Sequence, residues 1–151
     1  MSNEDLIAKL QELLPEATLQ QGNDFVELTI DSKQLLPVLN LLKSSSDLSF
    51  NFLFCETCVD WKTHFTMVYH LDSTLFRHNV VIKTNLNREL PEIETACHLY
   101  RTAELHEREI FDLFGIKFLN HPQLRRILLT DEWVGYPLRK DYEDPINMIK
   151  L

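Results

Sequence analysis

Glycine is scarce in this 151-residue chain, which contains only three glycine residues. Phosphate-binding loops need several of them close together, because a Cβ atom would obstruct the approach of the backbone to the phosphate. The sequence therefore leaves almost no place for such a loop. Cysteine is also scarce: three residues, an odd number, follow an acidic N-terminus that lacks the basic start of a secretory signal. This combination favours a protein of the reducing cytoplasm.

Long apolar runs and an excess of positive charge are missing as well. No stretch approaches the roughly 18–20 apolar residues that span a bilayer, so we expect no direct membrane insertion. The net charge is −8, and residues 1–100 hold 7 Lys and Arg against 14 Asp and Glu. A nucleic-acid partner is not expected, because phosphate contacts require a basic face. Residues 101–151 hold 8 against 9, which indicates ion pairing within the chain or with a partner.

Apolar residues make up 44% of the chain, an ordinary fraction for a globular domain. Helical spacing and capping residues predict helices over residues 2–15 and 31–42, with Pro37 delaying or kinking the start of the second. Alternating apolar residues predict strands over residues 25–30, 49–58, 63–71 and 78–84. Helical spacing returns over residues 93–114.

The strands over residues 49–58 and 63–71 are expected to form a hairpin, with Phe50, Phe52 and Phe54 on one face of the first strand. Strands followed by helices, without strict alternation, favour an α+β fold. We expect a mixed or antiparallel sheet of about four strands with helices packed on it. We therefore divide the chain into an α+β core, residues 1–114, and an irregular, extended C-terminal segment, residues 115–151, that packs on the core and on a partner.

The last predicted helix has two different sides. Helical spacing places Ala103, His106, Ile110, Leu113 and Phe114 on one side, and Leu105, Arg108, Glu109 and Asp112 on another. Gly115 follows at the C-cap, where left-handed backbone is required most often. We expect the apolar side to pack on the sheet while the other side offers a row of carboxylates.

Matching cations lie downstream of this helix at Arg125, Arg126, Arg139 and Lys140. Forks between arginine and carboxylate are directional, so we infer that they pin the irregular tail to the helix or to a partner. The plainer interpretation is a set of surface ion pairs worth at most about 1 kcal/mol each. It explains less well why these charges stand among so many phenylalanine, leucine and isoleucine residues, because a desolvated charge costs energy unless it is paired.

The segment from Glu107 to Tyr142 carries a long and irregular pattern. An E-R-E-x-x-D-x-F-G-I-x-F run begins at Glu107, H-P-x-L-R-R-I-L begins at His121, and W-x-G-x-P-L-R-K-D-Y begins at Trp133. In this order the three runs resemble the C-type subunit, or 30-kDa subunit, of NADH:quinone oxidoreductase, which is respiratory complex I. Leu105 stands at about the place where that family has a tryptophan.

The resemblance implies a cofactor-free α+β subunit of the hydrophilic arm, with no catalytic, cofactor-binding or metal-binding residues of its own. FMN, iron–sulfur clusters and quinone would be held by other subunits, and the complex would pass electrons from NADH to quinone and pump protons. The expected partners are the quinone-cavity subunit, of the D type, and neighbouring subunits of the arm. The expected place is peripheral, on the cytoplasmic side of the cell inner membrane.

Within this interpretation the charged residues of the pattern hold neighbours together. The expected electrostatic clamps are Glu107, Arg108, Glu109, Asp112, Arg125, Arg126 and Arg139, and Asp141 belongs to the closing run. Gly115 and Pro122 would shape the turn after the helix, and His121 would anchor a loop or meet a partner's backbone. Arg126→Ala is accordingly expected to weaken association with the quinone-cavity subunit more than it lowers the melting temperature of the isolated chain.

Other interpretations stay open. The same scaffold role is found in the related subunits of membrane-bound hydrogenases, formate hydrogenlyases and F420H2-type dehydrogenases. A stand-alone hydrolase using Glu107, Glu109 and Asp112 is a third hypothesis, although the sequence supplies no nucleophile for it. Cys55 and Cys58 are not expected to bind zinc, which takes four ligands, and in a regular strand the two residues point to opposite faces.

Overall fold

The main sheet of the computed structural model, which describes residues 2–148, has five strands in the order β1-β2-β5-β4-β3. These are β1 (Thr18–Gln21), β2 (Val26–Ile30), β3 (Phe52–Asp60), β4 (His64–Ser73) and β5 (His78–Asn87). The β2–β5 pair is parallel and the other pairs are antiparallel, so the sheet is mixed. The predicted α+β class is confirmed, with one strand more than expected because the short, exposed β1 carries no alternating apolar pattern.

The N-terminal helices begin where their capping residues predict. Helix α1 (Asn3–Leu13) follows Ser2, whose hydroxyl accepts from the Asp5 backbone while the Asp5 carboxylate accepts from the Ser2 backbone. A 3-10 turn, η1 (Ser32–Gln34), follows the capping side chain of Asp31, and helix α2 (Leu35–Ser44) continues from it. Pro37 lies in the first turn of α2, where the missing N–H leaves no helical bond unmade.

The β3–β4 hairpin shows which side chains face the core. Phe65, Met67, Tyr69 and Leu71 are all buried, as their alternation predicts. The predicted face of Phe50, Phe52 and Phe54 is wrong: Phe50 is buried ahead of the strand, whereas Phe52 and Phe54 are exposed. A register shift between Leu53 and Cys55 changes which residues point inward, and such a shift has no simple signature in the apolar pattern.

The helix predicted over residues 93–114 is shorter than expected. Helix α3 runs from Ala103 to Phe114, and the residues before it form strand β6 (Glu92–Glu94) and turns. β6 pairs in parallel with β7 (Lys117–Leu119) beyond the helix. Because this pairing joins segments on both sides of α3, the periodicity of residues 93–102 by itself could not reveal it.

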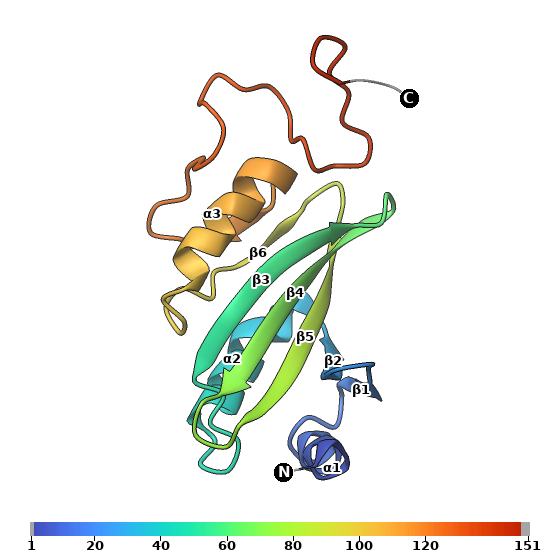
Figure 1. Ribbon diagram of the computed structural model, residues 1–151, viewed down its shortest axis with the longest axis vertical. Helices are drawn as coiled ribbons and strands as arrows, with labels where there is room; N and C mark the ends of the chain where they lie inside the picture. Colours follow the sequence, from blue (N-terminus) through green and yellow to red (C-terminus); the bar gives the residue numbers. More distant parts are fainter. Residues whose placement is uncertain (1, 149–151) are drawn as a thin grey trace.

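Helices α2 and α3 contribute to one hydrophobic core with the inward side of the sheet. Ile116 and Phe118, at the start of the predicted C-terminal segment, are buried in the same core. Figure 1 shows α1 near one end of the sheet, with α3 beside β3 and the C-terminal segment looping over the opposite end. Residues 149–151 of that predicted segment, and Met1 of the predicted core, lie outside the described residues. Among the described helices, none is long and apolar enough to cross a membrane.

Candidate functional site in helix α3 and the C-terminal segment

Gly115 ends helix α3 and turns the chain toward β7. Its backbone is left-handed, with φ of 73°, and its N–H donates to the Phe111 carbonyl at 2.9 Å. A Cβ atom at this position would lie 2.5 Å from the ring of Tyr136. Glycine is therefore required twice, for the left-handed turn and for the close packing of the C-terminal segment on the end of the helix.

Asp112 is the main anchor of the C-terminal segment. Its side chain is fully buried and accepts from Arg126 Nη1 at 2.8 Å, and from the backbone N–H groups of Ile127 (3.1 Å), Leu128 (2.7 Å) and Leu129 (2.9 Å). Burial by itself would raise the pKa of Asp112, but the hydrogen bonds from Leu129, Arg126 and their neighbours outweigh it and lower the pKa. The ionised carboxylate thus organises three successive N–H groups of a segment that has no regular structure.

The Arg126 guanidinium forms its bonds inside the chain. Nη1 also donates to the Asp112 carbonyl at 2.9 Å, and Nη2 donates to the carbonyls of Trp133 and Gly135, each at 3.2 Å. The guanidinium carbon lies 5.3 Å from the centre of the Tyr136 ring. The Arg126 side chain thus holds together three parts of its own chain, and the effect of Arg126→Ala on association with a partner stays a prediction.

Arg108 and Arg139 bind backbone carbonyls across the same region. Arg108 donates from Nε to the Arg125 carbonyl and from Nη2 to the Arg126 carbonyl, both at 3.2 Å. Arg139 Nε donates to the Phe114 carbonyl at 2.6 Å, and its guanidinium carbon lies 4.8 Å from the centre of the Tyr136 ring. Both arginines therefore connect α3 to the segment that follows it.

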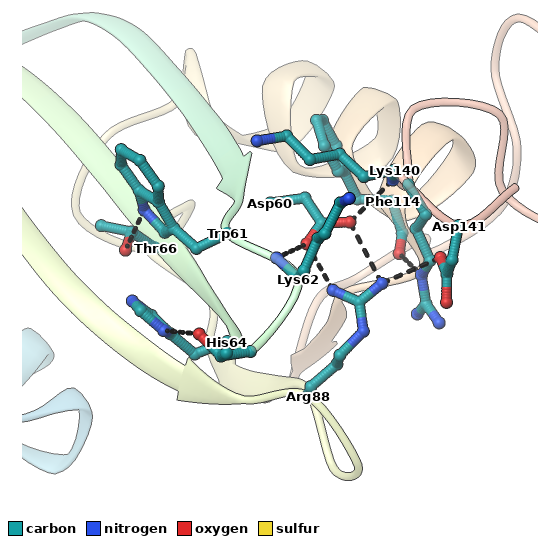
Figure 2. A network of polar contacts seen from close by, with 11 residues as sticks. Asp60, Trp61, Lys62, His64, Thr66, Arg88, Phe114, Lys140 and Asp141 are labelled. Carbon is teal, nitrogen blue, oxygen red and sulfur yellow. Dashed lines mark hydrogen bonds and ion pairs between the residues drawn. The ribbon is translucent and has the colours of Figure 1, made fainter.

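A second anchor lies at the tip of the β3–β4 hairpin (Figure 2). The buried carboxylate of Asp60 forms a fork with Arg88 and accepts from the backbone N–H groups of Lys62 at 2.7 Å and Lys140 at 2.8 Å. Arg88 Nη2 also donates to Asp141 at 2.8 Å. Burial opposes ionisation of Asp60, but Arg88 and the two N–H groups lower its pKa to about 2.

Sequence reasoning missed Asp60 and Arg88, although it named their contact Asp141. An aspartate at a hairpin turn is ordinary, and nothing in the sequence shows that a residue 80 positions away donates to it. The fork itself joins Asp60 to Arg88, 28 positions away, and such a pairing leaves no recognisable signal in one sequence.

His121 anchors the loop after β7. Its side chain is fully buried, Nδ1 accepts from the Gln123 N–H at 3.0 Å, and Nε2 donates to the Glu104 carbonyl at 3.0 Å. Because Nδ1 acts as an acceptor, Nε2 carries the proton. The adjoining Pro122 is exposed.

Glu107 lies in α3, is fully buried, and has hydrogen-bond partners different from those of Asp112. It accepts from the Thr95 hydroxyl and from the Ala96 N–H, the latter at 2.6 Å. Burial raises the pKa of Glu107 to about 7, against the opposing effect of these two hydrogen bonds. The spacing of Ala103, Glu107, Ile110 and Phe114, all buried, is that of one helix face.

The side of α3 that carries Glu109 and Asp112 is not the predicted row of carboxylates, because Asp112 is buried while Glu109 is exposed. Glu107 and Asp112 are buried toward different partners, and Glu109 is exposed, as is Arg125. The three carboxylates do not converge on one point, which removes the geometry that the hydrolase hypothesis needs. Within residues 2–148, no group of three or more histidine, cysteine, aspartate or glutamate residues is arranged to hold a metal ion. The hydrogen bonds and ion pairs of these residues fix the path of the irregular C-terminal segment.

The fold is that of known respiratory subunits. Over 93% of this chain and 85% of the other, it matches a chain in the structure of the membrane-bound sulfane sulfur reductase, an archaeal respiratory membrane complex, with a TM-score of 0.77 and 23% identity. It also matches the trypsin-resistant fragment (1-134) of Nqo5 over 82% of this chain and 100% of that one, with a TM-score of 0.70 and 21% identity.

Curated relatives are closer in sequence. The C-type subunit of the NADH-quinone oxidoreductase of Moorella thermoacetica is 40% identical over 141 residues, covering 92% of this chain and 94% of the relative. The C/D-type subunit of the NADH-quinone oxidoreductase of Phocaeicola vulgatus is 42% identical over 113 residues, which are 74% of this chain and 22% of the relative. Residues 28–146 match the family described as the respiratory-chain NADH dehydrogenase, 30 Kd subunit. The chain that ties its irregular tail to α3 through Asp112 and Arg126 therefore belongs to this 30-kDa subunit family.

Proposed function

We propose that the chain is a cofactor-free structural subunit in the hydrophilic arm of a proton-pumping NADH:quinone oxidoreductase, docked against the D-type subunit that forms the quinone cavity. Electron transfer from NADH to quinone is then a property of the whole complex, whose FMN, iron–sulfur clusters and quinone are held by other subunits. The chain lies peripherally on the cytoplasmic side of the cell inner membrane. Its own contribution is to hold its neighbours in place.

The observation that carries this proposal is a contrast within the C-terminal segment. The backbone is held by buried polar anchors at Asp112 and Asp60, yet large apolar side chains point outward. The exposed fractions are 64% for Leu128, 87% for Val134, 51% for Leu138 and 89% for Ile146. Apolar side chains on a fixed, protruding frame are typical of a surface that another protein covers.

The shape of the segment supports the same interpretation. Its loops border a hollow of about 490 Å³ whose lining includes Thr130, Trp133, Val134, Tyr142 and Ile146. An aromatic or apolar anchor of a partner fits such a hollow. Because the internal anchors already order the loops, docking loses less conformational entropy than it would with a mobile tail.

The relatives support a D-type subunit as the partner. The Phocaeicola vulgatus relative carries the combined designation C/D and is much longer than this chain, which spans 22% of it. A single polypeptide that serves as both subunits keeps them next to each other. We infer that the separate chain described here occupies the same neighbourhood through a noncovalent interface.

The test is co-expression of the chain with the D-type subunit of its own complex, followed by affinity measurement. Val134→Asp combined with Leu138→Asp should raise the Kd more than tenfold, since full burial of each apolar side chain contributes about 1.5–3 kcal/mol and 1.4 kcal/mol is a factor of ten. The melting temperature of the isolated variant should stay unchanged, because both side chains are exposed.

Leu75→Asp is the matched control. Leu75 is 67% exposed in the turn between β4 and β5, at the end of the sheet opposite the C-terminal segment (Figure 1). It should leave the Kd at its original value. Equal affinities for the double variant and the unchanged chain would contradict the proposed docking surface.

A second candidate function is the same scaffold role in a different membrane-bound complex. The likeness to a chain of the membrane-bound sulfane sulfur reductase, an archaeal respiratory membrane complex, at a TM-score of 0.77, supports this candidate. A membrane-bound hydrogenase, a formate hydrogenlyase or an F420H2-type dehydrogenase is the alternative assembly. Native mass spectrometry of the purified membrane complex distinguishes them, because an NADH-linked complex contains a flavin-bearing NADH subunit.

A further inference from the structure

Two buried carboxyl groups lie between helix α3 and strand β3. Glu56 points inward from β3 and is 5% exposed, and Glu107 points inward from α3 and is fully buried. Helix α3 packs directly against strand β3, and the charge of Glu107 contributes to raising the pKa of Glu56. Neither has a place in the anchors of the C-terminal segment.

The two groups differ in their hydrogen bonds. Glu107 accepts from the Thr95 hydroxyl and the Ala96 N–H. Both oxygens of Glu56 are buried without a hydrogen bond of ordinary geometry to any of the described residues. The Tyr69 hydroxyl, which belongs to the residue opposite Glu56 in β4, lies near enough to lower its pKa but also lacks such a bond.

The surroundings supply no strong counter-charge. The other titratable groups that interact with the pair are Cys55 of β3, Tyr69 of β4, Cys97 and His121. Among the described residues, no lysine or arginine forms an ion pair with either carboxyl group. His121 Nε2 is 3.8 Å from Glu107 Oε2, but that nitrogen donates to the Glu104 carbonyl.

Two ionised carboxylates in such a place would be costly, because burial penalises each charge and the charges repel each other. Burial, followed by the charge of Glu107, raises the pKa of Glu56 well above its usual range, and burial raises that of Glu107 to about 7. Glu107 has two donors and Glu56 lacks them, so the proton stays on Glu56 when the pair holds only one.

We propose that Glu56 and Glu107 form a buried proton-binding site, and that the protons held there keep helix α3 packed on strand β3. Loss of protons places like charges between the two elements and drives them apart. Since Asp112 and Gly115 tie the C-terminal segment to α3, the docking surface moves with the helix. The site thus couples the pH to the position of the docking surface. This proposal does not depend on which complex the chain joins.

The direction of the pH effect follows from the raised pKa values. Consider a carboxyl group whose pKa is higher in the folded chain than in the unfolded chain. It contributes its full stabilisation at pH values below the unfolded pKa, which is 4.5 for glutamate. That contribution is lost as the pH rises through the folded value, about 7 for Glu107. The folded chain should therefore lose stability between about pH 5 and pH 8.5.

The experiment compares urea unfolding of the full chain with that of Glu56→Gln across this pH range. For the unchanged chain, the unfolding equilibrium constant should rise by more than about a hundredfold, since each unit of pKa shift is a factor of ten. For Glu56→Gln the rise should be at least about tenfold smaller, because the amide neither ionises nor repels Glu107, and only the part due to burial of Glu107 should remain. Glu109→Gln, on the exposed side of α3, is the matched control and should retain the full rise.

Infrared spectroscopy of the unchanged chain gives a second measurement that needs no variant. A buried protonated carboxyl band should be present at about pH 6 and weaken toward higher pH, and Glu56→Gln should reduce it to the part that Glu107 contributes. Parallel stability profiles for Glu56→Gln and the unchanged chain would overturn the proposal. So would the absence of a protonated carboxyl band at about pH 6.

Discussion

Glu107 and Asp112 stand five residues apart on one helix, are equally buried, and have pKa values shifted in opposite directions. The difference lies in their partners. Asp112 receives an arginine and three N–H groups, whereas Glu107 receives two neutral donors. At the scale of the residue, burial decides the cost of a charge and the number of donors decides whether the charge persists.

Removing the Asp112 carboxylate should strongly destabilise the chain. Asp112→Ala leaves the largely buried Arg126 without its counter-ion and three backbone N–H groups without an acceptor. We expect the free energy of unfolding to fall by about 3–5 kcal/mol, measured by urea denaturation. Glu109→Ala, an exposed change on the same helix, should stay within about 0.5 kcal/mol, and equal effects of the two changes would contradict the anchor.

Asp60 should give stability that is lost in acid. Its pKa is lowered from 3.8 to about 2, so its contribution is present above 3.8 and disappears as the pH falls through about 2. The shift corresponds to about 2 kcal/mol. Thermal unfolding between about pH 5 and pH 2 should show a smaller loss for Asp60→Asn than for the unchanged chain, and identical losses would argue against the Arg88–Asp60 fork.

At the scale of the element, α3 is defined by its ends and by its spacing. Residues 103, 107, 110 and 114 form its buried face, and one of them, Glu107, is polar. The interpretation of Glu107 as an electrostatic clamp followed from its charge, whereas helical spacing places it on the buried face with Ala103, Ile110 and Phe114. The N-terminal end of α3 was predicted about ten residues too early, because β6 has only three residues and its partner β7 follows the helix.

Gly115→Ala should destabilise the end of α3. The left-handed φ of 73° is unfavourable for alanine, and the new methyl group would overlap the Tyr136 ring. We expect a loss of more than about 1 kcal/mol in the free energy of unfolding. In a double-mutant cycle, Tyr136→Ala should recover the part due to overlap while leaving the part due to φ, and strictly additive losses would exclude the overlap.

At the scale of the whole molecule, a segment without regular structure is fixed at two distant places. Asp112 holds it where it leaves the core, and the hairpin tip holds it near residues 140 and 141. Figure 1 shows the segment passing over α3 between these regions. Polar anchors rather than a large apolar core determine its path, which leaves its apolar side chains for a partner.

Releasing the second anchor should expose the segment to protease. Arg88→Met removes the fork with Asp60 and the bond to Asp141. Limited trypsin digestion should then cleave after Arg139 and Lys140 several-fold faster, because local opening precedes cleavage. Arg77→Met, in the exposed turn between β4 and β5, should leave cleavage there unchanged, and equal protection of both variants would show that this anchor is dispensable.

The sequence by itself determined the elements whose signals are local. The capping box at Ser2, the alternation in β4, the apolar side of α2 and the glycine at the end of α3 each act within a few residues. The run from Glu107 to Tyr142 also determined the family, since that pattern needs no fold to be recognised. Only the tertiary structure decided how β6 meets β7, which residue accepts from Lys140, and that Glu56 of β3 and Glu107 of α3 are both buried. These contacts join residues that are far apart in the chain. Their energies depend on burial, which exists only once the core has formed.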